Sequence, residues 1–166
     1  KNPTDAYLFQ VGQGNIRIVR RSTLPLSSSV LEKSGLTISD QVKKPSLDPF
    51  DVDENGDYNE YFTIEIIKDN FNGDILNGNG PSGHNLLPEN VTMYKIEFGW
   101  YGAIGVRFYA YVPVGNGECR WVVMHTLVIE NQLTGPCLED SYFRLFYSVN
   151  ITNNELLRTP QFVYKY

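Results

Sequence analysis

The chain has 166 residues, of which 42% are hydrophobic and 20% charged, and its net charge at pH 7 is -5. This length fits a single domain with one core, and the hydrophobic fraction excludes general disorder. No apolar run approaches the roughly 20 residues that span a bilayer, and an acidic chain lacks the basic surface that phosphate binding requires. We therefore expect one globular domain over residues 1–166, with no membrane insertion and no nucleic-acid partner.

Eleven Tyr and nine Phe against two Met favour β-structure, because flat rings pack well on a pleated sheet. The first predicted hairpin lies near the start of the chain. A short apolar piece is followed by Gly12 and Gly14, which predict a turn. Asn15 to Arg20 then alternates, with Ile16 and Ile18 on one side, and this pattern predicts a strand.

Residues 22–50 are rich in Ser, Pro and Leu, with prolines at positions 25, 45 and 49. Because proline lacks a backbone donor, we expect this segment to wrap over the sheet rather than join it, or to reach a neighbouring subunit as an extended arm. Val30 to Lys33 is predicted as one helical turn, and Leu36 to Ser39 as a short extended piece.

An acidic segment follows, in which Asp51, Asp53, Asn55 and Asp57 repeat the first half of a calcium-binding loop. The twelfth position, where a bidentate Glu belongs, is Phe62. Two interpretations stay open: a weak Ca²⁺ half-site, and an acidic Asn-Gly turn that opens the next strand. We favour the turn and expect no other cofactor.

Tyr61 to Lys68 predicts a strand, with Phe62, Ile64 and Ile66 on one face. The long Gly- and Asn-rich stretch at residues 69–90 is predicted as a surface Ω-type loop. It has no strand-to-helix context, so its glycines do not indicate a phosphate-binding loop.

The next part of the chain predicts an antiparallel meander of four strands joined by short turns. The segment Arg120 to Glu130 is apolar on both faces, which predicts a central strand covered on both sides. The four strands are Tyr94 to Trp100, Val106 to Val112, Arg120 to Glu130, and Tyr142 to Val149.

Few residues suggest catalysis. His125 lies in a predicted strand, where a packed, hydrogen-bonded histidine is the simplest interpretation. No nucleophile motif is visible, and the strand glutamates sit singly, whereas glycoside hydrolysis needs two converging carboxylates. We therefore predict that the chain is not an enzyme and has no catalytic residues.

Cys119 and Cys137 flank one strand; they are either free thiols, which we favour, or a disulfide that requires the strand to fold back.

One face of the predicted meander is unusually aromatic. Tyr109 and Tyr111 share it with Arg107, and Tyr101 lies at the preceding turn. Tyr at this density is typical of protein–protein interfaces, where a large flat side chain is buried at low entropic cost. The alternative is a glycan-binding surface, because sugars stack their apolar faces on aromatic rings.

Three segments resemble a unit of large virion structural proteins of tailed phages that infect cyanobacteria: N77-G-N-G-P-S-G83, M93-Y-K-I-E-F-G-W-Y-G-A-I-G-V-R-F-Y-A-Y-V-P-V-G-N-G-E118 and R120-W-V-V-M-H-T-L-V-I-E-N131. The opening V11-G-Q-G-N-I-R-I-V-R-R21 and the closing F143-R-L-F-Y147 resemble the same unit, so the similarity covers about two-thirds of the chain. It implies a non-enzymatic component of the particle.

This motif contains three glycines that allow the chain to reverse direction tightly: Gly99, Gly102 and Gly105. We expect the ring of Trp100 to cover the end of the core. The sequence starts at Lys1 without an initiator Met or a signal-peptide profile. We therefore expect it to be part of a longer chain.

The predicted fold is an all-β antiparallel β-sandwich, jelly-roll or lectin-like, with the long segment 22–50 outside the sheets. The predicted function is that of a structural virion domain in the tail, neck or fibre apparatus, assembled in the host cytoplasm. Its expected partners are other virion proteins, including copies of itself. Two alternatives are a module that binds host-surface polysaccharide and a capsid decoration or cement protein.

Overall fold

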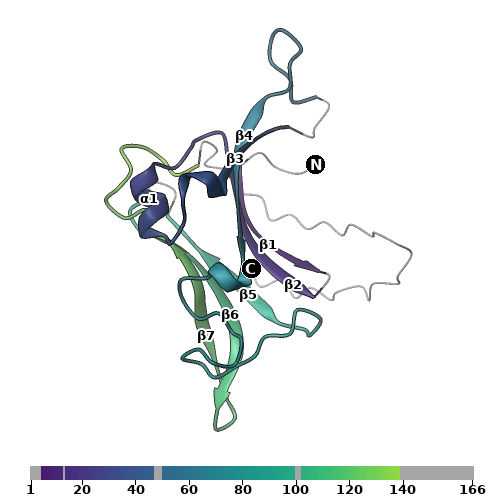
Figure 1. Cartoon of the computed structure of the whole chain (residues 1–166), viewed down its shortest axis with the longest axis vertical. Helices are drawn as coiled ribbons and strands as arrows, with labels where there is room; N and C mark the ends of the chain where they lie inside the picture. Colours follow the sequence, from purple (N-terminus) through teal and green to yellow (C-terminus); the bar gives the residue numbers. More distant parts are fainter. Residues whose placement is uncertain (1–4, 13, 47–49, 100–101, 139–166) are drawn as a thin grey trace, which may run out of the picture.

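The computed structural model describes residues 5–12, 14–46, 50–99 and 102–138. Figure 1 shows two antiparallel sheets with little helix. The strands of the first sheet lie in the order β1 (Ala6–Gly12), β2 (Asn15–Ser22), β4 (Glu60–Ile67) and β3 (Gln41–Pro45). Those of the second lie in the order β5 (Met93–Glu97), β6 (Val106–Gly115) and β7 (Glu118–Leu127). The prediction of an all-β antiparallel sandwich is confirmed.

The first predicted hairpin is present. β1 and β2 pair antiparallel with Gly12 opposite Asn15, so the connection is a tight turn. Gly14 has a φ of 71°, a left-handed backbone conformation that glycine adopts without a steric penalty. Ile16 and Ile18 point into the core, as their alternation predicts.

Residues 22–50 correct one prediction, because part of this segment joins the first sheet. The segment contains α1 (Ser28–Lys33), which includes the predicted helical turn, and η1 (Ile38–Asp40) in place of the predicted extended piece. β3 then pairs with β4 at the sheet edge. Pro45 is the last residue of β3, where its missing N–H is tolerated.

The segment is also not an extended arm over its described residues. Leu26, Val30, Leu31 and Leu36 are buried in the common core. The side chain of Ser27 caps α1 by accepting a hydrogen bond from the backbone N–H of Val30 at 3.4 Å.

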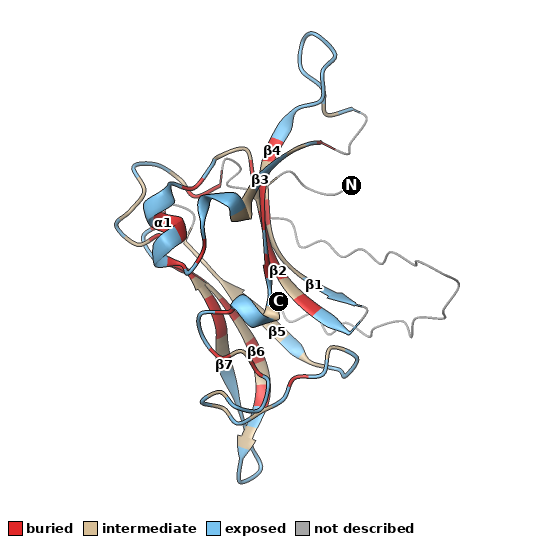
Figure 2. Cartoon of the chain, in the orientation of Figure 1, coloured by how far each residue is buried: buried red, intermediate tan, exposed pale blue. Residues whose placement is uncertain are grey.

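The core lies between the two sheets, and Figure 2 shows buried residues on the strands of both. Alternate residues of β6, from Val106 to Val112, are buried, as period-2 geometry requires, whereas no residue of β3 is buried. Phe108 in β6 is fully buried, and its ring packs edge-on against Tyr7 and Phe9 of β1, with centroid distances of 6.2 and 5.6 Å. These ring contacts join the second sheet to the first.

The second sheet contains three of the four predicted meander strands, and the fourth, Tyr142 to Val149, lies outside the described residues. The prediction that Arg120 to Glu130 is a central strand is wrong among the described strands, because β7 lies at the edge of its sheet and ends at Leu127. The prediction that it is covered on both faces is wrong for its first residues. Among the described strands, β6 is the central one. The first four residues of β7 are exposed because the β6–β7 hairpin projects past the buried part of the sheets (Figure 2).

The outer edge of β7 is covered by the long loop that follows η2 (Lys68–Asn70). The backbone N–H groups of Gly73 and Asp74 donate to the carbonyl oxygens of Met124 and Val123 at 3.0 and 2.9 Å. Phe71, Leu76 and Leu86 of the loop are buried. Residues 69–90 are therefore partly a packed element of the core, and not only a surface loop.

The packing of Phe108 predicts that Phe108→Ala lowers the free energy of unfolding by about 3–5 kcal/mol, because it removes a large buried side chain and leaves a cavity. Urea unfolding followed by circular dichroism measures this change. Phe50→Ala is the matched control, since Phe50 is 85% exposed. A loss below about 1 kcal/mol for Phe108→Ala would contradict the placement of this ring in the core.

Candidate functional site

Tyr109 and Tyr111 lie on the face of the second sheet that points away from the first sheet. Cross-strand pairing sets the neighbours of these tyrosines: Lys95 lies opposite Tyr109, and Met93 and Trp121 lie opposite Tyr111. We name this surface the outer aromatic face and define it by Met93, Lys95, Glu97, Arg107, Tyr109, Tyr111 and Trp121.

The rings of this face form one connected group. Tyr111 and Trp121 lie 5.2 Å apart between ring centroids. The Nζ atom of Lys95 lies 4.0 Å from the centroid of the Tyr109 ring and 5.4 Å from that of Trp121, which are cation–π distances. Trp121 and Met93 are exposed by 41% and 57%. The face thus presents large apolar side chains to solvent next to charged groups.

The charged side chains of this face are paired, two of them with each other and Arg107 with a neighbouring glutamate. The hydroxyl of Tyr109 donates to Oε2 of Glu97 at 2.7 Å, and Lys95 forms an ion pair with Glu97 at 3.6 Å. Arg107 forms an ion pair with Glu130 at 3.8 Å. The hydrogen bond from Tyr109 is the main cause that lowers the pKa of Glu97, whereas burial and then Glu97 raise the pKa of Tyr109.

The structure brings together three of the predicted site residues, Arg107, Tyr109 and Tyr111, whereas Tyr101 and Trp100 lie outside the described residues. Sequence reasoning missed Lys95 and Trp121. The pairing register of β6 and β7 explains why Trp121 was missed. Gly115 pairs with Glu118 across the hairpin turn, but an irregularity between Pro113 and Gly115 shifts the pairing by one residue.

The predicted glycine-rich turn lies beside this face. The N–H of Gly102 donates to the carbonyl oxygen of Gly99 at 2.9 Å, and Gly102 has a φ of 69°. A Cβ atom at Gly105 would collide with the carboxylate of Glu130, the partner of Arg107. Glycine at position 105 therefore permits the close approach of Glu130.

The acidic segment forms the favoured Asn-Gly turn. Val52 and Tyr58 form an isolated bridge, and Gly56 has a φ of 86°. Oδ1 of Asp53 accepts hydrogen bonds from the N–H groups of Asp57 and Asn55 at 3.0 and 2.9 Å, and these bonds lower its pKa. No group of three or more His, Cys, Asp or Glu residues that could hold a metal ion occurs within the described ranges.

The predictions for the thiols and for His125 are confirmed. Cys119 is an exposed thiol and Cys137 a buried one, and neither forms a disulfide. His125 is fully buried, and its Nδ1 atom accepts a hydrogen bond from the backbone N–H of Asn72 at 3.2 Å. Burial lowers the pKa of His125 to about 4, so the imidazole is neutral at pH 7.

Comparison with known protein families, curated proteins and solved structures finds no match to this chain. In the described part of the chain, no helix has the length and apolar character needed to cross a membrane.

His125 predicts that stability decreases on acidification. Its pKa is about 4 in the folded chain and about 6.5 in the unfolded chain, so the unfolded state binds more protons between these values. The stabilisation is fully present above pH 6.5 and is lost as the pH falls toward 4.

We expect acidification from pH 7 to pH 4 to destabilise the wild type by about 3 kcal/mol more than His125→Asn, whose amide oxygen can accept the same hydrogen bond without titrating. Urea unfolding at each pH measures the difference. His84→Asn is the matched control and should retain the wild-type dependence. If the free energy of unfolding fell equally with pH in the wild type and in His125→Asn, His125 would not be the cause of the acid destabilisation.

Proposed function

We propose that this chain is a non-enzymatic structural domain of a phage virion, in the tail, neck or fibre apparatus, and that it contacts other subunits through the outer aromatic face. The observation that supports a contact role is the exposure of Trp121 and Met93 beside Tyr109 and Tyr111, on a sheet face whose charges are already paired. Aromatic residues and Met are enriched in protein interfaces, and paired charges reduce the cost of removing water.

The virion context comes from the sequence resemblance around Trp100 and Arg107. The buried, hydrogen-bonded position of His125 supports a packing role for this residue.

Glycan binding on the same face has weaker support. A sugar that stacks on an aromatic ring needs an uncovered ring face. The ammonium group of Lys95 lies over the rings of Tyr109 and Trp121 and occupies that position. A protein partner can instead pack against the ring edges and the aliphatic part of Lys95.

The proposal predicts that Trp121→Ala reduces the amount of this domain in assembled particles by about tenfold or more, because truncation of a central aromatic contact costs on the order of 2 kcal/mol. Quantitative mass spectrometry of purified particles measures the incorporation. The fold should persist, since Trp121 is partly exposed, and urea unfolding of the isolated variant checks this. Lys43→Ala, on the first sheet, is the control and should incorporate normally.

Antibody labelling of the wild-type particles tests the location by electron microscopy. Label on the tail, neck or fibres supports the proposal. Label spread over the capsid shell would contradict it in favour of a decoration protein, and particles without the domain would refute a virion role. Normal incorporation of Trp121→Ala would refute the role of the outer aromatic face.

A further inference from the structure

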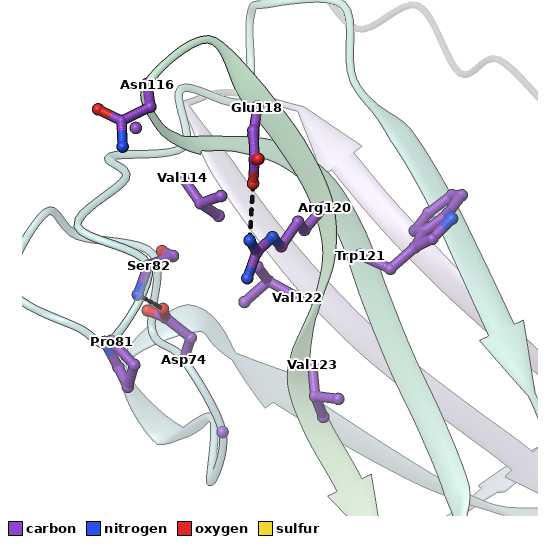
Figure 3. A pocket seen from close by; sticks show the side chains of 12 residues that line it. Asp74, Pro81, Ser82, Val114, Asn116, Glu118, Arg120, Trp121, Val122 and Val123 are labelled. Atoms are coloured by element: carbon purple, nitrogen blue, oxygen red, sulfur yellow. Dashed lines mark hydrogen bonds and ion pairs between the residues drawn. The ribbon is translucent and has the colours of Figure 1, made fainter.

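A cleft of about 560 Å³ lies between the projecting half of the β6–β7 hairpin and the loop from Gly73 to Ser82 (Figure 3). Val114, Arg120 and Val122 extend from the hairpin toward the loop. The ring of Trp121 lies on the other side of the β7 ribbon. Trp121 is nevertheless among the residues that line the cleft, so the cleft adjoins the outer aromatic face along β7.

The loop wall of the cleft is preorganised. The side chain of Asp74 is buried, and its two carboxylate oxygens accept hydrogen bonds from the N–H groups of Leu76 and Ser82, each at 2.8 Å. Burial by itself raises the pKa of Asp74, but hydrogen bonds from Ser82 and Leu76 outweigh it and the net shift is downward. Asp74 is thus an anion that holds the loop closed on itself.

Two glycines are required for this arrangement. A Cβ atom at Gly80 would collide with the Asp74 carboxylate, and one at Gly73 would collide with the carbonyl oxygen of Val123. The loop backbone therefore approaches the Asp74 carboxylate and strand β7 more closely than a residue with a Cβ atom would allow. Because this loop is already ordered, it loses little conformational entropy when a ligand binds.

The lining of the cleft combines apolar and hydrogen-bonding groups. Val114, Val122 and Pro81 supply apolar contact. Arg120 forms an ion pair with Glu118 at 2.6 Å, and both side chains remain largely exposed, so their other donor and acceptor positions face solvent. These two exposed charges offset each other, and the third charge of the lining, the Asp74 carboxylate, is buried and already hydrogen-bonded to the loop.

We propose that this cleft binds one sugar unit of a neutral glycan. A pyranose ring presents C–H groups to apolar side chains and hydroxyl groups to charged donors and acceptors. The volume lies within the range of small-molecule sites. A peptide strand is disfavoured, because Met124 and Val123 already accept hydrogen bonds from the loop along this edge of β7. This proposal does not depend on the proposed virion contact.

Amide NMR spectra of the full 166-residue chain test the site, with the methyl glycosides of glucose, galactose and mannose added separately. At about 10 mM, a site with a Kd of about 1 mM is roughly nine-tenths filled. We expect at least one glycoside to shift the signals of the loop from Gly73 to Ser82 and of the hairpin from Val114 to Val123, in a saturable manner.

Arg120→Ala and Glu118→Ala each remove one side of the exposed ion pair and should weaken binding by about tenfold, as expected for a hydrogen bond to a charged group. Lys43→Ala is a matched control, since it breaks an exposed Lys43–Glu60 ion pair on the other sheet. It should leave the affinity unchanged, as should Tyr109→Ala on the outer aromatic face.

Three results would overturn the proposal. The first is that none of the three glycosides causes a saturable shift. The second is a shift confined to the outer aromatic face, which would place sugar binding there instead. The third is unchanged affinity in both Arg120→Ala and Glu118→Ala, with the wild-type spectrum otherwise retained.

Discussion

The hydrogen bonds between Asn72–Asp74 and the outer edge of β7 are the contact on which much of the second sheet depends. The side chain of Asn72 accepts from the N–H of Thr126 and donates to its carbonyl oxygen, both at 2.8 Å. An unpaired strand edge invites association with another chain, and here the protein's own loop covers it. The same contact occupies Nδ1 of His125 and fixes one wall of the cleft.

Two buried polar side chains, those of Arg20 and Asp74, bind backbone atoms of segments outside the strands. Arg20 is 1% exposed, and its Nη2 atom donates to the carbonyl oxygens of Leu24 and Cys137 at 2.8 and 2.7 Å. Asp74 likewise accepts from backbone N–H groups. Because a buried polar group without a partner is costly, these hydrogen bonds constrain the connecting segments.

The outer aromatic face and the cleft share β7 but differ in chemistry. Alternation of side chains places Trp121 on the first surface and Arg120 on the second. The outer face is aromatic, which is the basis for the proposed protein contact. The cleft places opposite exposed charges beside apolar side chains, which is the basis for the proposed small neutral ligand.

Local patterns in the sequence determined the all-β class, most strand positions, the Asn-Gly turn and the shared face of Arg107, Tyr109 and Tyr111, because period-2 alternation and turn chemistry act over a few residues. Only the tertiary structure decided that Gln41–Pro45 joins the sheet, that residues 72–74 cover β7, and that Trp121 lies opposite Tyr111. Counting back from the hairpin turn pairs Tyr111 with Val122. A single irregularity in the ladder moves the pairing by one residue, and such shifts depend on packing between segments that are distant in the sequence.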